Sequence, residues 1–281
     1  MTKRLFLFAG YTPDGILDDS LVLYVRELAA LGDVVLCMDS DCDESELEKI
    51  KSLVLHADGV RHGEYDFGSY KRAYIWTRDN LDLKKYNFVY MVNDSVYGPL
   101  FPLKPYLTEM ESTNTDAFGL VKNTKRAHPH IQSWFIGMRG TVFLSEWYDT
   151  FMSRITKLPS KGDVTKVYEH GFTRNVAEHG GTWMCTFSAH NRDVYNKIKK
   201  YYRAKMPFIK KAAFVRHNGR LGHQIAYVLH RTPAPMRDAI IENARRVYGE
   251  KYTNDILSMG AITAFMRGLK YGIKKLLAGK L

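Results

Sequence analysis

The stretch "YNFVYMVNDSVYGPLFPL", residues 86–103, has the pattern that decides the fold. Its apolar run, Val89–Val92, is followed at once by "NDS" at residues 93–95 and then by a Gly-Pro turn. An unbroken run of this kind predicts a strand buried on both faces, as in a parallel sheet. Burying a lone carboxylate is costly, so Asp94 needs a partner. It either faces a crevice that admits a cation with substrate phosphates or caps its own turn.

Apolar runs at residues 5–9 and 34–38 precede this strand, and each is followed by a segment with helical spacing. Alternating strands and helices predict βαβ units, and therefore an α/β fold with a mostly parallel sheet flanked by helices. We also expect helices at about residues 16–31, 103–111, 141–155 and 163–178, and strands at 117–121, 133–138 and 180–187. The pattern beyond residue 203 is largely helical. We therefore predict one α/β domain over residues 1–205 and a helical region over 206–281.

The charge of the 281-residue chain is unevenly distributed. Residues 1–191 contain 21 Lys and Arg against 25 Asp and Glu, a net charge of −4, whereas residues 192–281 contain 20 against 5, a net charge of +15. This asymmetry indicates a negatively charged partner, either nucleic acid or an anionic membrane, unless the basic face is only solvated.

The cysteine and hydropathy patterns predict a cytoplasmic protein. The chain has three cysteines without a paired framework, which favours a reducing compartment. The apolar run near the start is shorter than the core of a signal peptide, and no stretch approaches the roughly 20 apolar residues of a membrane span.

The last segment, "GAITAFMRGLKYGIKKLLAGKL", has apolar residues at intervals of three and four with basic residues between them and no acidic residue. This pattern is typical of a helix that lies on an anionic membrane, here the inner leaflet of the plasma membrane. Packing of the same helix against its own domain is the alternative. The basic residues are Arg267, Lys270, Lys274, Lys275 and Lys280.

Acidic residues recur where predicted strands end and helices begin. Asp39 and Asp41 follow one strand, where a carboxylate can bind a base or ribose. Asp66 and Gly68 stand at a helix entrance, where backbone N–H groups and Lys71 can meet a diphosphate. Each feature is weak by itself, but together they indicate a nucleotide site.

Four segments, "DDSLVLYVRELAALGD", "YDFGSYKRA", "VNDSVYGPLFPL" and "HIQSWFIGMR", resemble the rhamnan-synthesis F family of bacterial polysaccharide glycosyltransferases. The resemblance covers residues 5–187, and that family is similar to GT-A nucleotide-sugar transferases with a Rossmann-like sheet. It implies an activated sugar donor, with dTDP-rhamnose as the family-level expectation. The acceptor would be a lipid-linked glycan or a growing cell-surface polysaccharide such as lipopolysaccharide O-antigen or capsule.

The resemblance also implies roles for particular residues. Asp94 stands where GT-A enzymes have a metal-binding pair of aspartates, so it would hold Mg²⁺ or Mn²⁺, although this chain has only one carboxylate there. Glu169 in "YEHGFT" resembles the catalytic base of inverting enzymes, with His170 in place of a second acid. The donor-binding candidates are Asp39, Asp41, Asp66, Gly68, Lys71, Asn93, Asp94 and Ser95. The candidates for the acceptor or sugar pocket are His130, Gln132, Ser133 and Trp134.

Three other interpretations remain beside the transferase. The His-x-His spacing of His128 and His130 is a weak metal signal, because no third ligand is near in the sequence. A nucleic-acid-binding protein would fit the basic charge, but the excess is confined to the last third and no nucleic-acid motif occurs. We therefore expect no nucleic-acid partner. A non-catalytic glycan-binding relative of the same fold is the remaining alternative.

Overall fold

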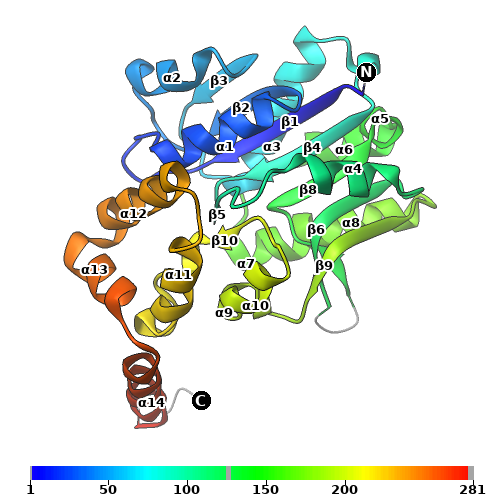
Figure 1. Ribbon diagram of the computed structural model, residues 1–281. Coiled ribbons are helices and arrows are strands. Elements are labelled where there is room, and N and C mark those ends of the chain that lie inside the picture. The colour runs from blue at the N-terminus through cyan, green and yellow to red at the C-terminus, as the bar shows by residue number, and fades with distance from the viewer. Residues whose placement is uncertain (1, 125–127, 278–281) are drawn as a thin grey trace. The chain divides into compact units, whose positions relative to one another are not determined.

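The structure is a computed structural model that describes residues 2–124 and 128–277 (Figure 1). Its chain forms two compact units. The first contains Met1–Leu17, Leu21–Ser95 and Pro102–Asn191, and the second contains Asp18–Ser20, Val96–Phe101 and Arg192–Leu281. The boundaries of these units differ from the predicted division at residue 205 into an α/β domain and a helical region, which stays a prediction.

The first unit is built on one sheet with the strand order β3-β2-β1-β4-β8-β6-β7, and β9 pairs with β6. Strands β3, β2, β1 and β4 are parallel to their neighbours, and β8 runs antiparallel to both β4 and β6. The sheet is therefore parallel in its first half and mixed in its second. The strands are β1 (Arg4–Gly10), β2 (Asp33–Met38), β3 (His56–Gly59), β4 (Phe88–Asn93), β6 (Ala117–Asn123), β7 (His130–Ile131), β8 (Phe135–Arg139) and β9 (Trp183–Ala189).

Helices flank this sheet, which confirms the predicted α/β class (Figure 1). Every residue of β4 is buried, as the unbroken apolar run predicted. Burying one large apolar side chain contributes about 1.5–3 kcal/mol, so the central strands are the main source of stability. The helices are α1 (Asp19–Ala29), α2 (Glu44–Lys51), α3 (Tyr65–Asn80), α4 (Lys104–Ser112), α5 (Gly140–Phe143), α6 (Glu146–Ser153), α7 (Lys161–Val164) and α8 (His170–Glu178).

Two predicted helices are interrupted. The helix expected at 141–155 is divided into α5 and α6, because the hydroxyl of Ser145 accepts the N–H of Tyr148 at 3.3 Å and begins a new helix. The helix expected at 163–178 contains a π-helical turn, η2 (Thr165–Glu169), between α7 and α8. Isolated π turns of this kind often occur at functional sites.

The second unit joins segments that are far apart in the sequence. The hydroxyl of Tyr97 donates to Asn243 at 2.5 Å, and the Asn243 amide donates to Asp18 at 2.6 Å. These buried bonds explain why two short early segments belong to this unit. Its elements are β5 (Val96–Tyr97), β10 (Ile209–Lys210), α9 (Asp193–Asn196), α10 (Ile198–Arg203), α11 (Gly222–Leu229), α12 (Ala234–Tyr248), α13 (Glu250–Ser258) and α14 (Ala261–Leu277).

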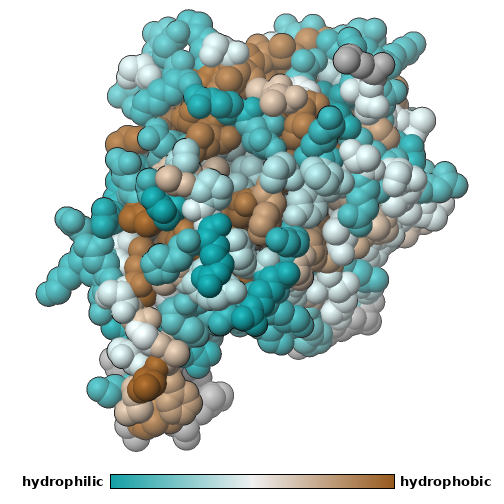
Figure 2. Space-filling view, viewed as in Figure 1, coloured by the Kyte–Doolittle hydropathy of each residue, from teal (hydrophilic) through white to brown (hydrophobic). Residues whose placement is uncertain are grey.

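Helix α14 has large apolar side chains in water. Ile262 is 82% exposed and Phe265 is 69% exposed, and Figure 2 shows apolar colouring over this helix. On the other side Ala264 is buried, and Arg267 forms an ion pair with Asp255 at 2.6 Å. Among the helices of the described ranges, none combines the length and the apolar character that crossing a bilayer requires.

Candidate active site

The carboxyl ends of the parallel strands meet at one edge of the sheet. Asp39 follows β2 and Asp94 follows β4 at this edge. Since β1 has β2 on one side and β4 on the other, the order of connection changes direction between β1 and β4. In open α/β sheets, ligands bind in the crevice at such a switch point. Asp94 therefore lies at the switch point of the sheet, and its role as a ligand contact stays a prediction.

Asp94 bridges the ends of two strands. Its backbone N–H donates to the carbonyl of Ala9 at 3.1 Å, and its Oδ1 accepts the N–H of Tyr11 at 3.2 Å. The turn of its own loop is tied instead by Asn93, whose Oδ1 accepts both the N–H of Ser95 at 3.1 Å and its hydroxyl at 2.6 Å. Asn93 thus makes side-chain bonds that close this turn.

Asp39 organises the approach to helix α3. Its Oδ1 accepts the N–H groups of His62 at 2.8 Å and Gly63 at 2.7 Å, and its Oδ2 accepts that of Tyr65 at 3.2 Å. Tyr65 has a φ of 60°, a left-handed conformation that is rare outside glycine. The carboxylate therefore stabilises an otherwise unfavourable backbone. Asp41 makes one similar bond at the surface, accepting the N–H of Arg61 at 2.9 Å.

The first turn of α3 is bonded to the end of β4. The Asn93 amide donates to Asp66 Oδ2 at 2.9 Å. Gly68 is buried beside Glu64, and a Cβ added there would lie 2.3 Å from the Glu64 Cβ, so only glycine fits. Lys71 donates to the carbonyl of Ile155 at 2.8 Å, and this bond engages the amine expected at the diphosphate.

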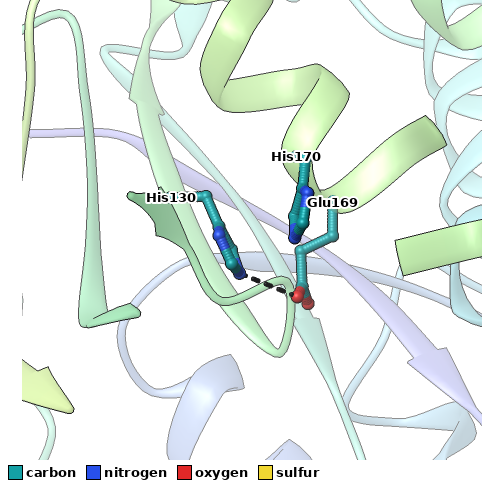
Figure 3. A group of neighbouring side chains, drawn as sticks. All are labelled: His130, Glu169 and His170. Carbon is teal, nitrogen blue, oxygen red and sulfur yellow. Dashed lines mark ion pairs between the residues drawn. The ribbon is translucent and has the colours of Figure 1, made fainter. Parts of the chain in front are cut away.

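Glu169 lies at the end of the π turn η2, where α8 begins. Its Oε2 accepts both the backbone N–H of Ser133, at 2.9 Å, and the Ser133 hydroxyl. Its Oε1 lies 3.2 Å from Nε2 of His130 in an ion pair, drawn as the dashed line in Figure 3. The side chain is 17% exposed, and both carboxylate oxygens contact protein groups.

Two histidines face Glu169. His130, on β7, is 4% exposed, and its Nδ1 lies 3.1 Å from the carbonyl of His128. The ring of His170 lies 4.1 Å from that of His130, measured between ring centres. One ligand atom from each of His130, Glu169 and His170 lies within 4.8 Å of the others, and Figure 3 shows both rings beside the carboxylate.

The pKa values of His130 and Glu169 are shifted in opposite directions by their contact. Burial lowers the pKa of His130, but the adjacent Glu169 carboxylate outweighs burial and raises that pKa above its usual value. Burial likewise raises the pKa of Glu169, but His130 and the Ser133 bonds outweigh it, so the pKa is lowered. Burial and the neighbouring His130 lower the pKa of His170. Glu169 is therefore ionised at neutral pH.

Residues 132–134 connect the two halves of this edge. The carbonyl of Ser133 accepts the Tyr70 hydroxyl at 2.9 Å, and that of Trp134 accepts the N–H of Asn93 at 3.2 Å. The Trp134 indole donates to Gln132 at 2.7 Å, and both side chains are buried. Trp134 thus has its ring among protein atoms, and its predicted place in a sugar pocket stays a prediction.

The structure brings most of the predicted site residues to one edge of the sheet through these bonds. His170 is a member of the Glu169 cluster to which the sequence gave no role of its own. In the sequence, His170 was noted only because it follows Glu169 at the position where inverting enzymes have a second acid. Glu169 and His170 lie about forty residues after His130 in the sequence and come close to it in the structure. His128, the other member of the His-x-His pattern, does not belong to this cluster.

In open α/β sheets of this kind, ligands bind at the carboxyl ends of the strands, where these carboxylates lie. The sequence then gives the family. The model of the family "rhamnan synthesis protein F" matches residues 34–270, and the chain belongs to this family, as the resemblance predicted. Membership supports the enzyme class, a glycosyltransferase that uses a nucleotide-activated sugar, and polysaccharide synthesis as its setting.

Solved structures of low sequence identity are similar to this chain. A putative nucleotide-diphospho-sugar transferase from Desulfovibrio desulfuricans has 15% identity and a TM-score of 0.44, over 91% of this chain and 99% of that one. A glycosyltransferase involved in glycosylation of the major capsid of PBCV-1 has 12% identity and a TM-score of 0.39, over 74% and 92%. No curated protein matches the sequence significantly.

Proposed function

We propose that the protein transfers a sugar, with dTDP-rhamnose as the donor, to a growing cell-surface polysaccharide or lipid-linked glycan. The observation that carries this proposal is the position of Asp94 at the switch point of the sheet, in a chain of the rhamnan synthesis family. Asp39, Asp41 and Asp66 are the proposed nucleotide contacts. Gly68 is a further proposed donor contact in the first turn of α3, where a Cβ would meet Glu64.

The proposed donor contacts differ in the support that they have. Asn93 and Ser95 adjoin Asp94 and have polar atoms at the same edge. Lys71 has weaker support, because its amine is bonded to Ile155. His130, Gln132, Ser133 and Trp134 are proposed to line the acceptor or sugar pocket, and all four residues are buried in the structure.

Mg²⁺ or Mn²⁺ is the cofactor proposed for the donor side. The donor set at the end of β4 consists of oxygen groups, from Asp94, Asn93 and Ser95, which suits these hard cations. With a single carboxylate, most of the remaining ligands would be water and the donor's own diphosphate. Asp94 would hold the ion, which would neutralise charge on the leaving diphosphate.

Glu169 is the proposed general base, acting in an inverting transfer. The acceptor hydroxyl must come within about 2.6–3.2 Å of a base that is ionised at the working pH. The lowered pKa keeps Glu169 ionised, and the two Ser133 bonds fix its orientation. Proton transfer to Glu169 would occur as the hydroxyl attacks the anomeric carbon and the bond to the diphosphate breaks.

The proposed location is the inner face of the plasma membrane, with α14 in contact with the lipid. Support comes from the exposed Ile262 and Phe265 and from the exposed amine of Lys270. Phe265 also lines a hollow of about 650 Å³ within the second unit, beside Arg220 and His223. The side chains of Lys274 and Lys275, and residue Lys280, lie outside the described part of the chain.

Nucleotide binding and transfer test the proposal. Purified protein is titrated with dTDP in the presence of Mg²⁺, and a panel of nucleotide sugars is then assayed for transfer. We expect dTDP to bind and Asp94→Asn to weaken it at least about tenfold, the loss of one charge-assisted contact. The control is Asp116→Asn, because Asp116 accepts the N–H of Thr182 near the opposite end of β8. Equal affinity in wild type and Asp94→Asn would contradict the assignment.

A further inference from the structure

Three potential metal ligands come together from two segments of the first unit. His130 is on β7, whereas Glu169 and His170 lie at the junction of the π turn η2 and α8. Their ligand atoms lie within 4.8 Å of one another. Two imidazole nitrogens and one carboxylate oxygen at this separation can bind one ion, and this ligand set occurs in catalytic zinc sites.

The buried histidine has the orientation that a metal ligand needs. Its Nδ1 lies 3.1 Å from the His128 carbonyl, which favours a proton on Nδ1 and leaves the lone pair on Nε2. Nε2 is buried, lies 3.2 Å from Glu169 Oε1, and has no partner in hydrogen-bond alignment among the described residues. Metal-ligating histidines commonly donate their second nitrogen to a backbone carbonyl in this way.

The carboxylate is oriented by a similar second layer of bonds. Both bonds from Ser133 go to Oε2 of Glu169, and Oε1 is the oxygen that faces the imidazoles (Figure 3). Hydrogen bonds to the second oxygen of a ligating carboxylate fix its rotation and are common around metal sites. His170 is only partly buried, so the cluster is open to water on its side.

We propose that His130, Glu169 and His170 form a binding site for one divalent transition-metal ion of the Zn²⁺ class. Mixed nitrogen and oxygen ligands favour Zn²⁺ or Co²⁺ over Mg²⁺ and Ca²⁺, which bind mostly oxygen. Three protein ligands leave a fourth position for water or a substrate oxygen. This site is separate from the proposed donor cation at Asp94, since it shares none of its ligands.

The site has a consequence for the proposed base. While Oε1 of Glu169 binds an ion, and Oε2 accepts the two Ser133 bonds, the carboxylate has no oxygen ready for the acceptor proton. Zn²⁺ binding is therefore expected to slow transfer. The binding proposal itself does not depend on the transferase proposal, because it concerns the protein without donor or acceptor.

Direct metal titration tests the site. Tag-free, full-length protein is treated with EDTA, dialysed, and titrated by calorimetry with ZnCl₂ and separately with MgCl₂. We expect one Zn²⁺ per chain and much weaker Mg²⁺ binding. His170→Ala should weaken Zn²⁺ binding by at least about tenfold, since even changes to residues behind the ligands cost that much. Co²⁺ in place of Zn²⁺ should give visible absorption in wild type that His170→Ala lacks.

The matched control is His179→Ala, at the C-terminal end of α8. His179 caps the end of α8, with its Nδ1 at 2.9 Å from the Asn175 carbonyl, and stacks on Trp147, outside the cluster. Thermal unfolding shows whether each variant is folded, and a second variant, Glu169→Gln, is used if His170→Ala is not. Equal Zn²⁺ affinity in the wild type, the cluster variant and His179→Ala would overturn the proposal, as would no Zn²⁺ binding by wild type.

Discussion

At the carboxyl edge of the sheet, polar side chains are buried and bonded to protein atoms, whereas on helix α14 large apolar side chains are exposed to water. Asp39 has three backbone N–H donors, and Glu169 has Ser133 and His130. Ile262, in contrast, is 82% exposed. A buried polar group must find its hydrogen-bond partners within the folded protein. An exposed apolar group can instead be covered later by a binding partner. The side chains at the carboxyl edge are thus ordered before any ligand binds, and α14 has exposed apolar surface that a partner can bind.

Replacing Glu169 is expected to have the largest effect at the carboxyl edge of the sheet. We expect Glu169→Gln to lower kcat about 10²–10⁴-fold, the usual contribution of a general base, with dTDP binding unchanged. Transfer is measured under saturating donor. Glu178→Gln on the same helix is the control, because Glu178 is exposed and pairs with Arg174 at the surface. A Glu169→Gln protein with the wild-type rate would remove this residue from catalysis.

Replacing Asp39 would show how much of the fold depends on the same edge. Asp39→Ala leaves the N–H groups of His62, Gly63 and Tyr65 without their acceptor. We expect the free energy of unfolding to fall by about 2–4 kcal/mol in urea titrations, because unsatisfied buried donors are costly. Asp41→Ala loses one exposed bond and should cost about 0.5–1.5 kcal/mol. Equal losses of unfolding free energy in the two variants would mean that the burial of Asp39 does not add to its stabilising effect.

Changing α14 should give the smallest effect, and one that appears only with a partner. Ile262→Asp should lower binding to vesicles of anionic lipid by at least about tenfold, because the side chain would no longer insert. The free energy of unfolding should change by less than about 0.5 kcal/mol. The control is Val247→Asp, an exposed apolar position on α12. If both variants bind vesicles as wild type does, α14 is not the contact.

The strands and their common edge were predictable because the apolar runs that mark them are local signals, and their alternation with helices implies parallel pairing. Apolar runs gave β1, β2 and β4, and the carboxyl ends of parallel strands lie at one edge, which placed Asp39 and Asp94 at the same edge of the sheet. The antiparallel direction of β8 against β4 was not predictable. Apolar periodicity does not encode the direction of such a strand.

The partners of the site residues were the harder part. The Ser133 bonds to Glu169 join residues 36 positions apart, and the closeness of His130 to His170 depends on where α8 begins. The loop after β4 also showed the limit of local reasoning. A turn bond was considered for Asp94, and the structure has such a bond from Asn93. Short polar side chains compete for such bonds, and the packing around the strand decides which of them wins.

The π turn at the start of α8 sets the rotational phase of this cluster. Successive side chains on an α-helix diverge by about 100°, yet the neighbours Glu169 and His170 both reach His130. Removing one residue from the turn, such as the exposed Lys166, would wind the segment as ordinary α-helix and change the rotation of α7 relative to α8 by about that angle. The extra residue of the π turn thus lets the chain before Glu169 keep its own packing while the acid and His170 stay on the side of α8 that faces His130.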